Sequence, residues 1–142
     1  MNFAQVAPGI FRSGQPDPQE LSAARQDGIK TLLVLRSRIP EAERRVAARL
    51  GLAIVHVPMD ANDIPPMDQV DRALDVVLDP SRRPILVHCA HGQERTGAVI
   101  AAYRVVSESW TPAAAEKEAL DFHFRFKNLA DFLARYREHR RR

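Results

Sequence analysis

Hydrophobic residues along the chain occur either in compact apolar runs or in longer stretches where apolar positions recur at helical spacing. Three compact runs, rich in leucine, valine and isoleucine, have the continuity that is typical of strands buried on both faces. These predicted strands cover residues 30–36, 53–59 and 84–89. Helical spacing, together with residues that favour helix starts and stops, predicts a second set of elements. These predicted helices cover residues 17–28, 40–51, 65–80, 96–109, 111–123 and about 128–139.

The order of these elements indicates the fold class. Strands that alternate with helices predict an α/β protein with a central, mostly parallel β-sheet flanked by helices on both faces. No internal repeat or low-complexity linker divides the sequence, so residues 1–142 are expected to form a single domain. In such folds ligands bind at the carboxyl ends of the strands. Cys89, the only cysteine, ends one of the predicted strands, so chemistry is expected at this position.

Composition limits the classes of protein to which the chain can belong. With 45% hydrophobic and 27% charged residues it is typical of a soluble globular domain. No apolar run approaches the ~20 residues that span a bilayer, so we expect no stable membrane insertion. One cysteine can form neither an internal disulfide nor a multi-cysteine zinc site. Together with an N-terminal segment that lacks a secretory pattern, this favours a cytoplasmic protein, which we expect to be a monomer.

The formal charge of +3 is unevenly distributed. Residues 135–142 contain five arginines, and the remainder of the chain is close to neutral. This distribution does not favour a nucleic-acid partner. The short basic C-terminal tail is expected to be solvated, and contact with an acidic partner or a membrane surface is the alternative.

The sequence HCAHGQERTG, residues 88–97, has the composition of an anion-binding loop. Gly92 permits a sharp turn between the preceding strand and the following helix. Such a turn directs free N–H groups at a helix N-terminus toward one point, where the helix dipole also attracts negative charge. The guanidinium of Arg95 is suited to grip two oxygens of a phosphate-like group. The predicted phosphate-binding residues are Ala90, His91, Gly92, Gln93, Glu94 and Arg95.

Cys89 begins this predicted loop, where positive charge favours its ionised form. A free thiol has a pKa of about 8.5, which falls at helix N-termini and beside cations, so Cys89 is predicted to be a thiolate nucleophile. His88 is expected to orient the loop through hydrogen bonds of its ring nitrogens, and Thr96 offers a hydroxyl that would stabilise the thiolate. The simpler interpretation is a small buried hydrophobic cysteine. That interpretation does not account for the glycine, arginine and threonine that follow.

The segment resembles the signature loop of the cysteine-dependent protein tyrosine and dual-specificity phosphatases, which reads His-Cys, five residues, Arg, Ser or Thr, then Gly. The match is complete at His88, Cys89, Gly92, Arg95, Thr96 and Gly97. The segments FRSGQP (11–16) and AAYRV (101–105) extend the resemblance to compact bacterial dual-specificity-like phosphatases, over about residues 10–125.

This resemblance implies a fold and an activity. It implies a dual-specificity phosphatase-like fold, and hydrolysis of phosphotyrosine in proteins or of small aryl phosphates through a phosphocysteine intermediate. Phosphoserine and phosphothreonine are the further candidate substrates. Neither a metal nor a cofactor is expected, because Arg95 and the backbone amides supply the positive charge.

The family also carries an aspartate that protonates the leaving oxygen, on a mobile loop upstream of the cysteine. The segment VPMDANDIPP supplies Asp60 and Asp63. Asp63 is favoured because the following IPP predicts a stiff turn and AND resembles the acid loop of some small dual-specificity enzymes. Asp60 directly follows the predicted strand, as the acid does in other members, so both remain candidates.

The order of the parts distinguishes this family from other cysteine-loop enzymes. Low-molecular-weight phosphatases and arsenate reductases carry the loop near the N-terminus, and rhodanese-like sulfurtransferases lack the Arg-Thr-Gly ending. Relatives that act on lipids or inositol generally carry lysines in the loop. This loop has none and contains Glu94, which favours a phosphoprotein substrate. A phosphoinositide or inositol phosphate phosphatase, and a catalytically silent phosphate-binding module, are the alternatives.

Two further sets of residues lie outside the signature. Arg12, Arg36 and Arg38 are candidates for a basic rim around the substrate. Phe122, Phe124 and Phe126 are expected to pack in the core under the last helix rather than to form a partner surface.

Overall fold

The computed structural model describes residues 2–60 and 62–141. This part of the chain contains a five-stranded sheet with the strand order β1-β2-β5-β3-β4. The strands are β1 (Ala4–Ala7), β2 (Ile10–Ser13), β3 (Thr31–Val34), β4 (Ala53–His56) and β5 (Ile85–His88). β1 is antiparallel to β2, and all other neighbouring strands are parallel. The prediction of an α/β protein with a mostly parallel sheet is confirmed.

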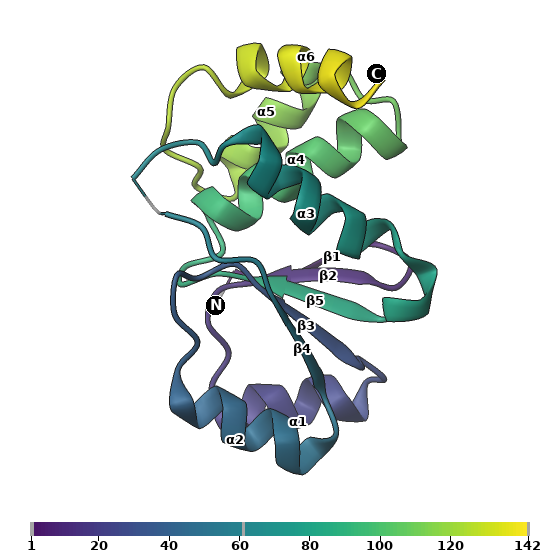
Figure 1. The fold of residues 1–142 in the computed structure, drawn as a ribbon, viewed down its shortest axis with the longest axis vertical. Coiled ribbons are helices and arrows are strands. Elements are labelled where there is room, and N and C mark those ends of the chain that lie inside the picture. Colours follow the sequence, from purple (N-terminus) through teal and green to yellow (C-terminus); the bar gives the residue numbers. More distant parts are fainter. Residues whose placement is uncertain (1, 61, 142) are drawn as a thin grey trace.

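Helices cover both faces of the sheet, as predicted (Figure 1). One face carries α1 (Pro18–Gln26) and α2 (Glu41–Leu50), and the other carries α3 (Met67–Leu78), α4 (Glu94–Ser107), α5 (Pro112–Asp121) and α6 (Leu129–Arg140). A short 3-10 helix, η1 (Pro80–Arg82), precedes β5. Every predicted helix is present, with slightly different ends.

Two apolar cores, one on each side of the sheet, explain why the central strands are continuously hydrophobic. In β3, Leu33 faces the core shared with α3 to α6, whereas Leu32 and Val34 face the smaller core shared with α1 and α2. Helix α4 lies within the larger core and is buried on nearly all sides. Because β5 and α4 are both embedded, the loop that joins them is held at both ends.

The hydrophobic pattern does not predict the β1–β2 hairpin. β2 lies inside the sheet, between β1 and β5, and pairs with β5 in parallel. It has four residues, of which Arg12 and Ser13 are polar and buried. Because two of its buried residues are polar, this strand does not form an apolar run and is not predicted from the hydrophobic pattern.

Residues 135–140 belong to α6. Arg135, Glu138 and His139 are exposed, as expected for a solvated tail, but the other residues of this segment are buried or partly buried. Tyr136 is fully buried, and its hydroxyl donates a hydrogen bond to Asp71 over 2.5 Å. Arg140 donates to Asp75 over 3.0 Å. The acidic face of α3 therefore pairs with the basic end of α6, and this pairing holds the arginine-rich segment against the domain.

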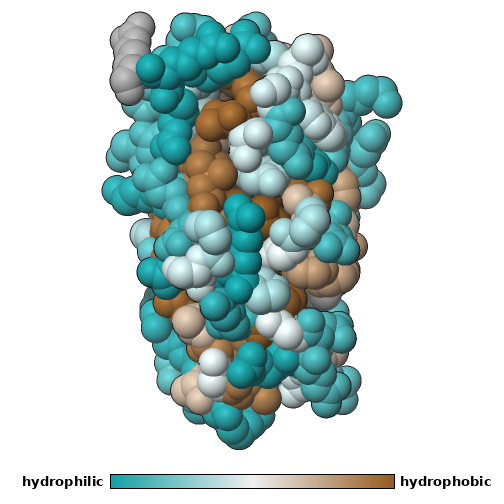
Figure 2. All heavy atoms as spheres, turned by 90° about the vertical axis from the view of Figure 1, so that its right-hand side faces the viewer, coloured by the Kyte–Doolittle hydropathy of each residue, from teal (hydrophilic) through white to brown (hydrophobic). Residues whose placement is uncertain are grey.

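Most large hydrophobic side chains lie inside the domain. Phe124 is buried and Phe126 is partly buried against the larger core, as expected for the segment under α6. Phe122 is half-buried and lies outside this core, so the expectation is wrong for it. Among the described residues the exposed large hydrophobic side chains are Phe3 and Leu120. The face shown in Figure 2 is largely hydrophilic, with a hydrophobic band visible in its upper half. None of the described helices has the length and apolar character needed to cross a bilayer.

Candidate active site

The loop of residues 89–95, called the anion loop below, joins the end of β5 to the first turn of α4. Gly92 has a φ of 72° and packs against the β2 end of the sheet. A Cβ atom at this position would lie 2.7 Å from the backbone of Ser13 and Gly14. Glycine is therefore required both by the backbone conformation and by the space available.

The thiol of Cys89 is surrounded by hydrogen-bond donors. The Gly92 N–H lies 3.3 Å from its Sγ, and the Thr96 hydroxyl lies 3.1 Å from it. Burial of the thiol opposes ionisation, since Cys89 is 2% exposed. The donors from Thr96 and Gly92 and the charge of Arg95 outweigh this burial, and they lower the pKa of Cys89 below its ordinary value.

Arg95 lies in the first turn of α4 and is largely buried. Its Nη1 donates to the carbonyl oxygen of Met59 over 3.3 Å. Met59 follows β4 and immediately precedes Asp60, so this hydrogen bond brings the proposed acid loop to the arginine of the anion loop.

Arg12 is the first correction to the predicted site. It is 1% exposed, so it is not a rim residue. Its Nη2 donates to the Gly92 carbonyl over 2.8 Å, and its guanidinium lies 3.9 Å from the centre of the Phe122 ring. Burial lowers the pKa of Arg12 to about 10, against the opposing charges of Glu118 and Cys89. Arg12 thus supports the anion loop from the interior of the domain.

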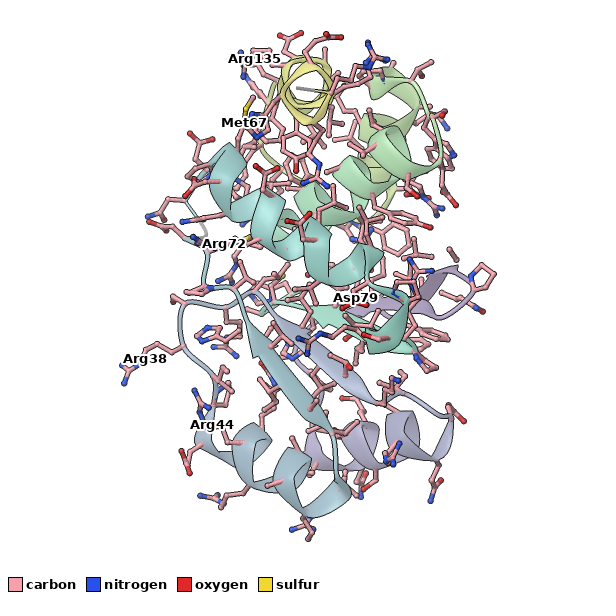
Figure 3. All side chains as sticks on the ribbon, turned by 45° about the vertical axis from the view of Figure 1, so that its right-hand side comes forward. Arg38, Arg44, Met67, Arg72, Asp79 and Arg135 are labelled. Carbon is pink, nitrogen blue, oxygen red and sulfur yellow. The ribbon has the colours of Figure 1, made fainter. Side chains whose placement is uncertain are left out.

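The other two predicted rim arginines differ from each other. Nη1 of Arg36 donates to Oε1 of Gln15 over 2.9 Å, and the backbone N–H of Gln15 donates to the Ala90 carbonyl over 2.9 Å. Arg36 therefore contacts the anion loop through Gln15. Arg38 is exposed and extends away from the domain (Figure 3).

His88 is fully buried and contacts both the anion loop and α2. Its Nδ1 lies 3.2 Å from the Cys89 carbonyl oxygen, and its Nε2 lies 2.6 Å from Oε2 of Glu43. Glu43 is 3% exposed, although it belongs to a helix whose other charged side chains are exposed. Sequence reasoning missed Glu43, because a single acid in an amphipathic helix resembles any solvated one.

The two candidate acids are both exposed. Oδ1 of Asp60 accepts from the Asn62 N–H over 3.2 Å, and Oδ1 of Asp63 accepts from the Ile64 N–H over 2.7 Å. Asp63 lines a groove whose other walls include Met67 and Arg135; Figure 3 shows these two side chains near each other where α3 and α6 meet. Within the described residues neither carboxylate makes a hydrogen bond to the anion loop.

The remaining loop side chains differ in their exposure. Ala90, His91 and Gln93 line an open polar cleft of about 450 Å³ beside the loop. Glu94 is largely buried, and its carboxylate pairs with the guanidinium of Arg125 over 2.5 Å. Its negative charge is therefore compensated. Among residues 2–60 and 62–141 no group of three histidine, cysteine or carboxylate side chains is placed to hold a metal ion.

Comparison with known proteins gives matches over most of the chain. A family model described as DSP-PTPase phosphatase fused to NAD+ kinase matches residues 5–131. The inositol diphosphatase DSP1 of Oryza sativa subsp. japonica is 34% identical over 109 residues, which cover 73% of this chain and 49% of that protein. The dual specificity protein phosphatase TpbA of Pseudomonas aeruginosa (strain UCBPP-PA14) is 26% identical over 118 residues, which cover 83% and 53%. The chain thus spans about half the length of these curated relatives.

Solved structures share the fold. The core catalytic domain of the PP-IP phosphatase SIW14 from S. cerevisiae, in complex with citrate, superposes with a TM-score of 0.88 at 28% identity, over 96% of this chain and 85% of that one. TpbA of P. aeruginosa superposes with a TM-score of 0.82 at 23% identity, over 100% and 92%. The predicted dual-specificity phosphatase-like architecture is therefore confirmed.

Replacing Thr96 by valine removes a donor to the Cys89 sulfur while nearly preserving side-chain shape. A hydrogen bond to a charged group is worth about 1.5–3 kcal/mol, so the pKa of the thiol is expected to rise. The rate of iodoacetate alkylation, measured against pH, should show a midpoint at higher pH than in the wild type. Thr111→Val is the control, because Thr111 caps α5 and does not contact the thiol. Equal midpoints in all three proteins would mean that the hydroxyl does not stabilise the thiolate.

Proposed function

The chain belongs to the family of DSP-PTPase phosphatases, and we propose that it hydrolyses phosphoric monoesters, above all phosphotyrosine in proteins, through a phosphocysteine intermediate on Cys89. The observation that carries this proposal is the environment of one sulfur atom. A buried thiol with a lowered pKa lies at the start of a loop that opens a helix and contains Arg95. In the proposal, this single loop provides both the thiolate nucleophile and the site that binds the phosphate dianion.

The proposed first step forms a phosphorus–sulfur bond and breaks the phosphorus–oxygen bond of the ester. The thiolate of Cys89 attacks phosphorus while Arg95 and the loop N–H groups hold the other phosphate oxygens. An aspartic acid protonates the departing alcohol.

In the second step, the same aspartate takes a proton from water. The water oxygen attacks phosphorus, and Cys89 leaves as a thiolate that accepts the hydrogen bond from Thr96. Inorganic phosphate and free enzyme result, so neither an oxidant nor a further reactant is required.

We assign the acid to Asp60, with Asp63 as the alternative. The support for Asp60 is the hydrogen bond from Arg95 to the Met59 carbonyl, which holds the residue before Asp60 at the anion loop. Asp63 follows three residues later and borders the groove between α3 and α6. The sequence favours Asp63 because a stiff turn follows it. That turn indicates how rigid the segment is, but not how far Asp63 lies from the substrate phosphate.

A second candidate substrate class is a compact inositol polyphosphate or diphosphate. Inositol diphosphatases are among the relatives, at 30–34% identity. The charge of Glu94 was the reason to expect that additional phosphates are repelled, and its pairing with Arg125 weakens that reason. The absence of lysine from the loop still favours a substrate with one phosphate.

Cys89→Ser is expected to abolish hydrolysis of p-nitrophenyl phosphate. Arg95→Lys should lower kcat/KM by about 10²–10³, because an ammonium group cannot reproduce the two-pronged grip on phosphate. The assay contains chelator and no added metal, and Arg38→Lys is the matched control at an exposed arginine. Full activity in Cys89→Ser would contradict the phosphocysteine mechanism. An inactive wild type that still binds a phosphopeptide would support the binding-module alternative.

The substrate class follows from kcat/KM on a phosphotyrosine peptide, a phosphoserine peptide and a diphosphoinositol polyphosphate. We expect the phosphotyrosine peptide to give the highest value. A higher value for the inositol compound, lost in Cys89→Ser, would transfer the assignment to the inositol class.

Asp60→Asn is expected to lower kcat by about 10²–10⁴ on an alkyl phosphate, which needs protonation of its leaving group, and by less on p-nitrophenyl phosphate. Asp63→Asn is the matched comparison, since it changes an exposed aspartate of the same loop. If the loss dependent on the leaving group occurs in Asp63→Asn instead, Asp63 is the acid.

A further inference from the structure

A chain of side-chain hydrogen bonds leads from the surface to the residue before the nucleophile. Arg36 donates to Oε1 of Gln15 over 2.9 Å, and Nε2 of Gln15 donates to Oε1 of Glu43 over 2.9 Å. The other carboxylate oxygen of Glu43 lies 2.6 Å from Nε2 of His88. The chain ends where Nδ1 of His88 meets the carbonyl of Cys89 at 3.2 Å. It connects α2 with the ends of three strands.

The partners of the His88 ring determine where its protons lie. A carbonyl oxygen can only accept a hydrogen bond, so Nδ1 must carry a hydrogen toward Cys89. A carboxylate can also only accept, so Nε2 must carry a hydrogen toward an ionised Glu43. Donation by both nitrogens would make the ring an imidazolium cation.

The surroundings of Glu43 favour its ionised form. Burial alone would raise the pKa of this carboxyl group, but hydrogen bonds from His88 and Gln15 and the charge of Arg36 lower it below the ordinary value. Both carboxylate oxygens have a donor. Arg36, after β3, is a further charged group that acts on Glu43. Cys89 contacts the pair through its backbone carbonyl.

We propose that Glu43 is a positioning residue of the active site, which keeps His88 doubly protonated and thereby fixes the first peptide of the anion loop beside a buried cation. This assignment gives a function to the buried acid of α2 that the hydrolytic steps do not use. The cation lies next to the nucleophile in the chain and favours its thiolate form. The consequence for turnover rests on the proposed phosphatase function, whereas the protonation of His88 does not.

The proposal has consequences for substitution at Glu43. Glu43→Gln keeps the size of the side chain, but its amide can donate to Nε2 of His88, so the ring can become neutral with Nδ1 alone protonated. The buried cation then disappears. Glu41→Gln is the matched control, because Glu41 lies in the first turn of the same helix and is exposed.

The decisive measurement is the nitrogen-15 NMR spectrum of the histidine side chains in the full chain at about pH 7.5. An unperturbed histidine, with a pKa of about 6.5, is largely neutral there. We expect His88 to show two protonated ring nitrogens in the wild type and in Glu41→Gln, and one in Glu43→Gln. His88→Asn identifies the signal by its loss. A neutral His88 ring in the wild type overturns the proposal.

Alkylation of Cys89 by iodoacetate tests the effect on the nucleophile without any substrate. At about pH 6, Glu43→Gln is expected to react roughly tenfold more slowly than the wild type, which corresponds to about one pKa unit of the thiol, and Glu41→Gln within about twofold. Equal rates in Glu43→Gln and Glu41→Gln overturn the proposed effect on the thiolate. If Glu43→Gln does not fold, the wild-type spectrum still decides the protonation of His88. A chain that shows both signatures but hydrolyses no phosphate would contradict the proposed function and leave this inference intact.

Discussion

The close packing of Gly92 against the backbone of Ser13 and Gly14 is the constraint on which the site depends. It places the turn of the anion loop directly on the end of β2, so the loop cannot relax outward without losing contact with the sheet. The hydrogen bonds from Arg12 to Gly92 and from Gln15 to Ala90 act at the same place. These contacts fix the backbone of the loop, and in the proposed function they would hold its N–H groups in position before a phosphate binds.

Charge is buried around this loop in pairs or against dipoles. The guanidinium of Arg12 lies between a carbonyl and an aromatic ring, and the Glu43 carboxylate accepts a hydrogen bond from Gln15 and lies 2.6 Å from the His88 ring. Burial of an isolated charge costs several kcal/mol of folding free energy. Loss of the partner of either group is therefore expected to destabilise the domain. The nearby Cys89 thiol is buried too, and hydrogen bonds from Thr96 and Gly92 and the charge of Arg95 lower its pKa. In the proposed function, a substrate phosphate would bind at the same loop, beside this thiolate.

The two layers of helices contribute differently to the site. The α3–α6 layer supplies α4, whose first turn carries Arg95 and whose body is locked in the larger core. The α1–α2 layer supplies Glu43, which reaches the sheet from the opposite face. Because the loop lies at the carboxyl edge of the sheet, between both layers, it receives support from each. This position is where ligands bind in folds of this type.

The fold class, the helices and the strands β3, β4 and β5 were predictable from the sequence by itself, and so was the lowered pKa of Cys89. These features depend on residues that are adjacent in the chain. Apolar runs define β3 and β5, and the segment from His88 to Gly97 contains the cysteine, the turn and the start of the next helix. The β1–β2 hairpin, the burial of Arg12 and the role of Glu43 were not predictable in this way. Arg12 and its hydrogen-bond partner Gly92 are 80 residues apart in the sequence, and Glu43 and His88 are 45 residues apart. The sequence does not distinguish a buried arginine or glutamate from an exposed one. Only the packing of β2 and α2 against the loop decides that Arg12 and Glu43 are the buried residues that contact this region.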